Sequence, residues 1–211
     1  MTGHKRQRSR YQKITLDGKT HGGRGKDRSP EYETIFPFSA KGMSILDLGC
    51  NAGFYCLRAA SEGARRVVGV DSDHILLRNA KKIAKEHDLD VEFVHGDMRT
   101  IELDGVFDTI LCLNVLHYFN SIEEVDIFLA RIMKWSPRTI AFVLAVPSKG
   151  QDFVMTIHST KKIPHRLAIW PEHIERAFPG YLAVIMDSRI RPRDRKLVML
   201  KKNWLQDMNW L

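Results

Sequence analysis

The chain has 211 residues, of which 44% are hydrophobic and 27% are charged, and its formal net charge is +8. This length suits one domain with appendages, and the composition is that of a globular protein with one sizeable core. No apolar run approaches the roughly 20 residues of a membrane-spanning helix, and no apolar stretch follows the basic first ten residues as a secretory signal requires. We therefore expect a cytoplasmic protein without membrane contact.

Short apolar runs and amphipathic stretches alternate from residue 44 to about residue 178, and two further apolar runs follow. The expected strands cover residues 44–48, 66–70, 91–94, 107–113, 139–146, 181–187 and 196–201, and the expected helices cover residues 54–62, 75–86, 121–134 and 171–178. Residues 147–169 are expected to be irregular. The alternation predicts a doubly wound α/β sheet of mostly parallel strands with helices on both faces. Because the last two strands are adjacent in sequence, the last strand is expected to be antiparallel.

The positive charge lies at the two ends of the chain. Residues 1–30 hold nine Lys or Arg and two Asp, and residues 185–202 hold seven basic and two acidic residues, which excludes a uniformly basic protein. We expect residues 1–30 to form a basic, flexible arm or lid, residues 31–202 to form the domain, and residues 203–211 to form a tail. The three cysteines form no CxxC pair, and no His or acidic pair has metal-ligand spacing, so we expect no metal.

A turn with two glycines follows the first expected strand and reads DLGCNAG over residues 47–53. Asn51 stands where a dinucleotide fingerprint has its second glycine, and no GK[ST] sequence follows as in a P-loop. The glycines let the backbone approach a ligand, the helix that begins at Gly53 offers N–H groups to a carboxylate, and Asp47 suits a cationic amine. The turn therefore predicts a ligand that carries an amino-acid group.

This turn resembles motif I of the class I S-adenosylmethionine-dependent methyltransferases, although Asn51 replaces the middle glycine of the motif. The resemblance covers about residues 44–201 and implies a Rossmann-like seven-stranded sheet, S-adenosylmethionine as cofactor and S-adenosylhomocysteine as product. It also implies that Asp71 binds the ribose, that Asp97 contacts the adenine amino group and that Met98 packs on the ring. The cofactor-binding residues that it implies are Asp47, Gly49, Cys50, Asn51, Gly53, Asp71, Ser72, Asp97, Met98 and Asn114.

Two more residues are candidates for the site, each with an alternative. His117 follows the fourth expected strand, where its imidazole could take a proton from the methyl acceptor, but this position also suits a pocket wall or core packing. Arg24 lies in a Gly- and Arg-rich stretch before motif I. In tRNA-wobble-uridine carboxymethyltransferases and similar enzymes such a stretch folds over the cofactor, so the resemblance implies that Arg24 pairs with the methionine carboxylate. The alternative is a flexible basic arm.

The sequence predicts the methyl donor better than the methyl acceptor. The cofactor itself activates the methyl group, and a general base is needed only if the acceptor atom starts protonated and is weakly acidic. The first hypothesis is methyl transfer to an oxygen or nitrogen of a small molecule. The second is methyl transfer to RNA, most plausibly tRNA, with phosphate contacts from the basic ends; these hold Arg6, Arg8, Arg10, Arg189, Arg191, Arg193, Arg195 and Lys196. The third is a protein that binds S-adenosylmethionine without catalysis.

Overall fold

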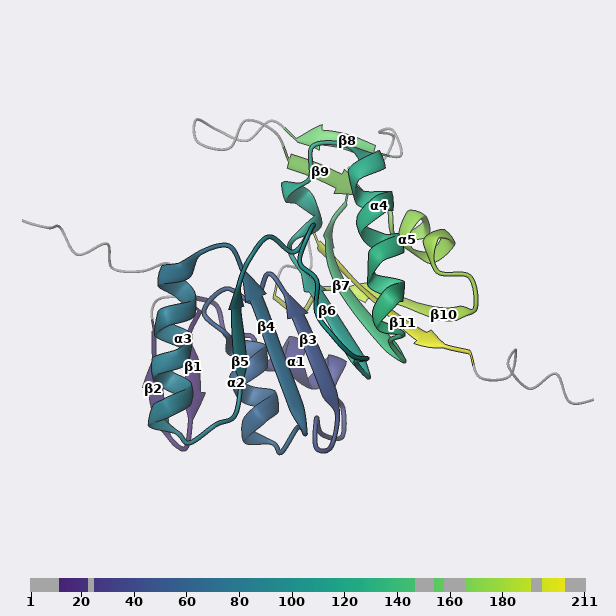
Figure 1. Cartoon of the computed structure of the whole chain (residues 1–211). Helices are drawn as coiled ribbons and strands as arrows, with labels where there is room; N and C mark the ends of the chain where they lie inside the picture. The colour runs from purple at the N-terminus through teal and green to yellow at the C-terminus, as the bar shows by residue number, and fades with distance from the viewer. Residues whose placement is uncertain (1–11, 23–24, 147–153, 158–165, 191–194, 204–211) are drawn as a thin grey trace, which may run out of the picture.

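The computed structural model describes residues 12–22, 25–146, 154–157, 166–190 and 195–203. A seven-stranded sheet forms its centre, in the order β10-β11-β7-β6-β3-β4-β5 (Figure 1). The strands are β3 (Ser44–Leu48), β4 (Arg66–Asp71), β5 (Glu92–His95), β6 (Thr109–Leu113), β7 (Thr139–Ala145), β10 (Tyr181–Asp187) and β11 (Arg195–Lys202). Strand β11 is antiparallel to both of its neighbours, and all other pairs of this sheet are parallel. The predicted seven-stranded sheet with an antiparallel last strand is confirmed.

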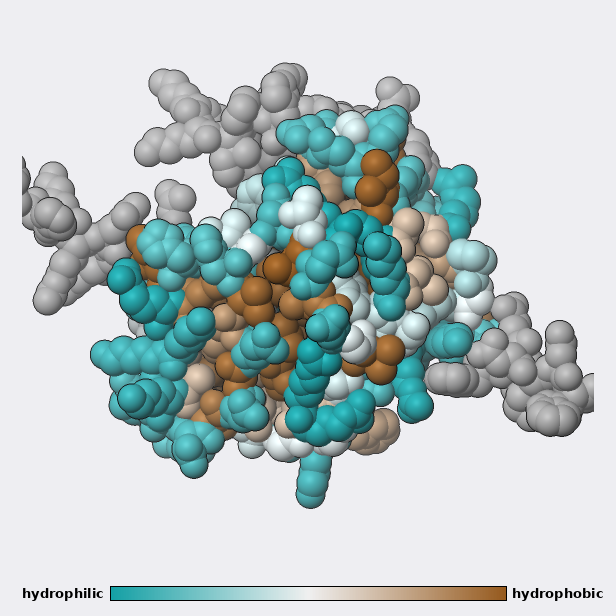
Figure 2. All heavy atoms as spheres, viewed as in Figure 1, coloured by the Kyte–Doolittle hydropathy of each residue, from teal (hydrophilic) through white to brown (hydrophobic). Residues whose placement is uncertain are grey.

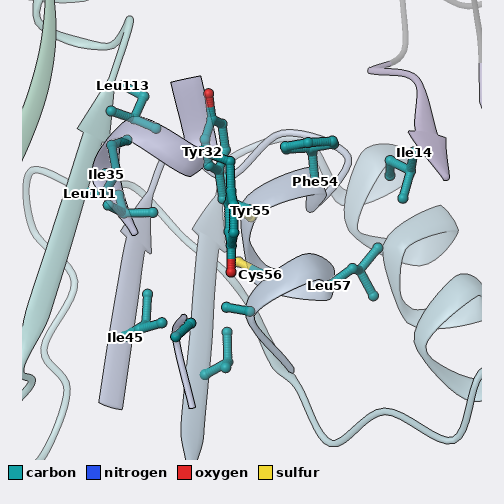
Figure 3. Packing of buried hydrophobic residues seen from close by; sticks show 14 of the residues in the cluster. Ile14, Tyr32, Ile35, Ile45, Phe54, Tyr55, Cys56, Leu57, Leu111 and Leu113 are labelled. Atoms are coloured by element: carbon teal, nitrogen blue, oxygen red, sulfur yellow. The ribbon is translucent and has the colours of Figure 1, made fainter. Parts of the chain in front are cut away.

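Helices pack on both faces of this sheet. Side chains alternate between the faces along each strand, so Ile45 belongs to one buried cluster and Leu46 to the other. The first cluster includes residues of α1 (Ser29–Ile35), α2 (Phe54–Ser61) and α3 (His74–Glu86), and Figure 3 shows part of it; the second includes residues of α4 (Ile122–Ile132) and α5 (Pro171–Ala177). This arrangement is the expected doubly wound fold.

The two longest helices begin at side chains that cap their first backbone N–H groups. The carboxylate of Asp73 accepts hydrogen bonds from the N–H groups of Ile75 and Leu76 at the start of α3. The hydroxyl of Ser121 accepts from the N–H of Glu124 at the start of α4, while the Glu124 carboxylate accepts from the N–H of Asn120. Such caps satisfy donors that lack a partner within the helix and fix where it begins.

A hairpin lies within residues 12–22, in the described part of the segment that was expected to form a flexible arm. Strands β1 (Ile14–Leu16) and β2 (Lys19–His21) pair through a turn at Asp17 and Gly18, whose φ angles are 48° and 74°. Positive φ at both central residues is typical of the two-residue hairpin turn that Asp-Gly favours. Ile14 and Leu16 are buried in the first cluster, so hydrophobic burial holds this hairpin on the domain. Residues 1–11 lie outside the described residues.

The segment expected to be irregular holds a second hairpin. Strand β8 (Val154–Ile157) pairs antiparallel with β9 (Arg166–Ile169), and two short 3-10 helices lie earlier in the chain, η1 (Leu116–Tyr118) and η2 (Met133–Trp135). Leu167 and Ile169 are buried in the second cluster, which fixes β9 on the domain. Residues 96–108 join β5 to β6 without a helix. Figure 2 shows the molecule from the same side as Figure 1, with apolar side chains gathered between polar ones near the middle of this face.

Gly69 in β4 provides a test of the packing beneath the first turn. A Cβ at Gly69 would lie 2.8 Å from the Cys56 sulfur, 2.9 Å from the Cys50 sulfur and 3.0 Å from the Phe93 ring. We expect Gly69→Ala to lower the free energy of unfolding by about 1–3 kcal/mol, because the core must shift to admit the methyl group. Chemical denaturation measures this change. The control is Gly96→Ala, whose Cβ would come closest to the flexible end of Ile101, and an equal loss in both variants would contradict the prediction.

Candidate functional site

A cavity of about 570 Å³ lies at the carboxyl ends of β3, β4 and β6. Strand β3 lies between the other two, so the strand order reverses here, and this is where doubly wound sheets bind their ligands. The predicted site residues that line the cavity are Asp47, Gly49, Cys50, Asn51, Asp71, Ser72, Asp97, Met98, Asn114 and His117. The structure thus brings together residues from four separate stretches of the sequence.

The turn at residues 47–53 has a left-handed backbone at three positions. The φ angles are 81° at Gly49, 55° at Asn51 and 82° at Gly53. The Asn51 side chain accepts a hydrogen bond from the next backbone N–H at 2.9 Å, and Asn tolerates this conformation better than most residues, which explains its place in the motif. Gly53 does not line the cavity; a Cβ there would lie 2.8 Å from the Phe93 ring, so it allows α2 to pack closely.

Gly49 lets Val115 pack closely against the turn, and its N–H group ties the turn to the sheet. The N–H groups of Gly49 and Cys50 both donate to the Val70 carbonyl, at 2.8 and 2.9 Å. A Cβ at Gly49 would lie only 2.4 Å from the Val115 side chain. Gly49 also lines the cavity, and the Val115 side chain leaves no room for a larger residue at this position.

Asp71 ends β4 and orders the turn with both of its carboxylate oxygens. One oxygen accepts from the Asn51 N–H at 2.7 Å, and the other accepts from the Asp73 N–H at 2.9 Å. Each carboxylate oxygen has a second lone pair, so Asp71 can still accept hydrogen bonds from hydroxyl groups of a ligand. Its position beside the turn suits the recognition of a diol.

Asp47 is buried, with only 2% of its surface exposed. The pKa of this carboxyl is raised from 3.8 to about 7. Burial is the main cause and the charge of Asp71 adds to it, whereas the Cys56 thiol and the Arg28 charge oppose the shift. The Cys56 sulfur lies 3.6 Å from the Asp47 carboxylate. A cationic ligand group beside Asp47 would stabilise the ionised form, so this site favours an amine.

Asp97 follows β5 and forms a close ion pair. The Arg99 guanidinium donates to both carboxylate oxygens of Asp97, with distances of 2.6 and 2.9 Å, and it lowers the pKa of Asp97. The carboxylate is 38% exposed and lines the cavity, so it stays ionised and can still accept from a ligand amino group. The half-buried Met98 side chain lies beside it, and its sulfur would be 3.9 Å from a Cβ at Gly49.

Asn114 and His117 follow β6 at the opposite wall of the cavity. The backbone turns sharply at Asn114, where φ is 61°, and its N–H donates to the Val143 carbonyl at 3.0 Å. His117 is 5% exposed, and its ring centroid lies 4.2 Å from that of Tyr118, which is 56% exposed. His117 is the single imidazole that lines the cavity in the described part of the chain.

The sequence reasoning missed several residues of the cavity wall. Arg24 lies outside the described residues, and Arg28, four residues further along the chain, lines the cavity. The Nε atom of Arg28 is buried and has no hydrogen-bond partner among the described residues, so it is available to an anionic ligand. Nothing in the run RGKDR marks Arg28 as a site residue, because its place in the cavity wall depends on where α1 begins. Other cavity-lining residues that were not predicted as cofactor-binding or catalytic include Gln12, Tyr55, Arg99, Ser188, Ile190 and Arg195.

Among the residues that the structure describes, no group of three or more His, Cys, Asp or Glu side chains could hold a metal ion. Within the same residues, no helix has both the length and the apolar character needed to cross a bilayer.

Residues 45–136 match the family of methyltransferase domains. The ubiquinone biosynthesis O-methyltransferase of Rickettsia akari is 22% identical over 120 residues, which cover 57% of this chain and 42% of that protein. The tRNA U34 carboxymethyltransferase of Actinobacillus succinogenes is 27% identical over 95 residues, which cover 43% of this chain and 30% of that protein. The chain thus spans less than half the length of these two relatives.

Solved structures share the fold along most of the chain. Magnesium protoporphyrin IX methyltransferase from Synechocystis, crystallised with S-adenosylmethionine, superposes with a TM-score of 0.61 at 18% identity and covers 85% of this chain and 86% of its own. The matched domain contains the turn at residues 47–53 together with Asp71 and Asp97, which the cavity brings together. Residues 45–136 therefore belong to the family of methyltransferase domains, and the fold along most of the chain is that of a solved methyltransferase.

Proposed function

We propose that residues 12–203 form an enzyme that transfers the methyl group of S-adenosylmethionine to an oxygen or nitrogen atom of a small molecule and releases S-adenosylhomocysteine. The observation that carries this proposal is the single cavity that joins the turn at residues 47–53 to the wall formed by Asn114 and His117. One side of the cavity offers charged groups that match the cofactor, and the other side leaves a histidine for the acceptor.

The charged groups fit the parts of S-adenosylmethionine one by one. Arg28 can pair with the methionine carboxylate, since its buried Nε lacks a hydrogen-bond partner among the described residues, and Asp47 can pair with the amine. Asp71 can accept from the ribose hydroxyls, Asp97 can accept from the adenine amino group, and Met98 can pack on the adenine ring. Gly49 lines the cavity and carries no side chain, so the ligand can lie against the backbone of the turn.

Bound S-adenosylmethionine supplies an activated methyl group on a sulfonium, so the residues of the chain need only align the partners and exclude water. Alignment of two reactants can account for about 7–11 kcal/mol of a barrier. In the proposed reaction, the acceptor atom forms a bond to the methyl carbon as the carbon–sulfur bond breaks. We propose that His117 takes the acceptor proton, because it is the single described imidazole in the cavity wall.

His117→Gln is expected to lower kcat by a factor of about 100 or more and to leave the Kd for S-adenosylmethionine within about twofold. The reason is that glutamine fills a similar space but cannot take a proton. Steady-state kinetics and calorimetry on the same preparation measure the two values. The control is His173→Gln, because His173 pairs with Asp126 at 2.7 Å and does not line the cavity. An unchanged kcat in the His117 variant would show that this residue only lines the cavity and takes no proton.

A small-molecule acceptor is supported by two similar proteins that act on small molecules by their names, a ubiquinone biosynthesis enzyme and a magnesium protoporphyrin enzyme. RNA is the second candidate, supported by similarity to a tRNA carboxymethyltransferase. Of the basic residues invoked for phosphate contacts, Arg189 is exposed and Arg195 is buried in the cavity wall. Arg6, Arg8, Arg10, Arg191 and Arg193 lie outside the described residues.

Transfer of label from methyl-labelled S-adenosylmethionine separates these candidates. The enzyme is incubated with a low-molecular-weight metabolite extract or with bulk tRNA, and the labelled product is followed by chromatography. Label in the metabolite fraction supports the proposal, and label in tRNA replaces it with the RNA hypothesis. Tight cofactor binding without label in either pool would support a non-catalytic binding protein.

The three cysteines are buried free thiols, which favours a reducing cytoplasm as the site of the reaction.

A further inference from the structure

Two segments that lie more than 150 residues apart in sequence meet at the wall of the cavity. The Lys26 ammonium donates to the Ile190 carbonyl at 2.9 Å, and the Ser188 hydroxyl donates to the Glu31 carboxylate at 2.6 Å. We call these segments, residues 26–31 and 188–190, the clasp. Arg28 belongs to the first segment, and Ser188 and Ile190 belong to the second; all three line the cavity. The clasp therefore joins the N-terminal part of the chain to the turn after β10 at the site itself.

Glu31 is the central residue of the clasp. It lies in the first turn of α1 and is 0% exposed, and a buried carboxylate is costly unless hydrogen bonds satisfy it. One of its oxygens accepts from Ser188 at 2.6 Å, and the other lies 3.5 Å from the Tyr55 hydroxyl on α2. An apolar residue would pack at this position without that cost. The carboxylate thus ties together α1, α2 and the turn after β10.

Arg28 connects the clasp to the ligand. Burial raises the pKa of the Tyr55 hydroxyl, the Glu31 charge raises it further, and the Arg28 guanidinium acts in the opposite direction. Arg28 and Glu31 therefore flank the same hydroxyl, one residue facing the ligand and the other facing Ser188. A ligand carboxylate that binds Arg28 would hold the first segment of the clasp in place.

We propose that Glu31 is a positioning residue that keeps the clasp closed over the methionine end of the cofactor, so that the cofactor leaves when the clasp opens. This inference rests on the proposed function, because it requires S-adenosylmethionine in the cavity. Glu31 itself does not line the cavity; it acts through Ser188 and Tyr55, which do. Loss of the carboxylate should therefore change how long the cofactor stays bound more than it changes the chemical step.

The test measures the release rate of S-adenosylhomocysteine by stopped-flow displacement, together with kcat and the KM for S-adenosylmethionine. We expect Glu31→Gln and Ser188→Ala to release the ligand about tenfold faster or more, since each weakens a hydrogen bond to a buried charge. The KM should rise while kcat does not fall. The matched control is Glu33→Gln on the same helix, whose carboxylate is 63% exposed and pairs with Arg58, and its release rate should equal that of the wild type.

The Lys26 contact gives a second, independent readout. Lys26→Ala should also speed release, and Lys26→Arg should restore the wild-type rate, because arginine can still donate to the Ile190 carbonyl. Release within twofold of the wild type in folded Glu31→Gln and Ser188→Ala variants would overturn the inference. Failure of the wild type to bind the cofactor at all would instead refute the proposed function, so the two failures are distinguishable.

Discussion

Asp71→Asn is expected to weaken S-adenosylmethionine binding by a factor of about 100 or more. The charged carboxylate accepts the Asn51 and Asp73 N–H groups and, in the proposed complex, the ribose hydroxyls. Hydrogen bonds to a charged acceptor contribute about 1.5–3 kcal/mol each, and an asparagine has only one oxygen with which to accept them. Isothermal titration calorimetry with S-adenosylmethionine measures the loss directly.

Asp73→Asn is the matched control for this experiment. Asp73 caps α3 through two backbone N–H groups and does not line the cavity. We expect this variant to bind the cofactor as tightly as the wild type, because asparagine is also a good helix cap. If Asp71→Asn binds within threefold of the wild type, Asp71 does not hold the ribose.

The central sheet could be predicted because each of its strands has a local sequence pattern that indicates a strand. The strands at residues 44–48 and 109–113 are buried along their whole length, so they appear in the sequence as largely apolar runs, which Asp47 interrupts once. Parallel strands that alternate with helices bring their carboxyl ends to one edge of the sheet. The topology therefore places Asp47, Asp71 and Asn114 around one cavity, although they are far apart in sequence.

The N-terminal part of the site could not be predicted, because its place depends on tertiary packing. Ile14 and Leu16 alternate with a polar residue over only three positions, which is too short a pattern to separate a docked hairpin from a basic arm. Arg28 faces the cavity because α1 begins one residue later and packs Tyr32 into the core. Glu31 and Ser188 meet across the fold, and no local pattern indicates such a contact.

Asp47→Asn is expected to stabilise the fold and to weaken cofactor binding at the same time. In the folded chain burial raises the pKa of Asp47 from 3.8 to about 7, so the native state binds a proton more tightly than the unfolded state. The contribution of Asp47 to the free energy of unfolding is therefore fully present below about pH 4, and it is lost as the pH rises through about 7. At pH 8 the wild type carries a buried charge that the asparagine variant lacks. We therefore expect the free energy of unfolding of the variant to be higher by a few kcal/mol and its Tm to be higher by several degrees.

Thermal denaturation of both proteins between pH 4 and pH 8 tests this prediction. The difference between the Tm of the variant and the Tm of the wild type should shrink as the pH falls. Cofactor affinity should change in the opposite direction. Between pH 5.5 and pH 7 the ligand amine stays protonated, so wild-type affinity should rise with pH as Asp47 ionises. The variant should bind about tenfold or more weakly at pH 7 and lack this part of the pH dependence, whereas any contribution from His117 would remain in both proteins. A variant that is destabilised at pH 8, or that keeps the wild-type pH dependence, would show that Asp47 is not the buried partner of the amine.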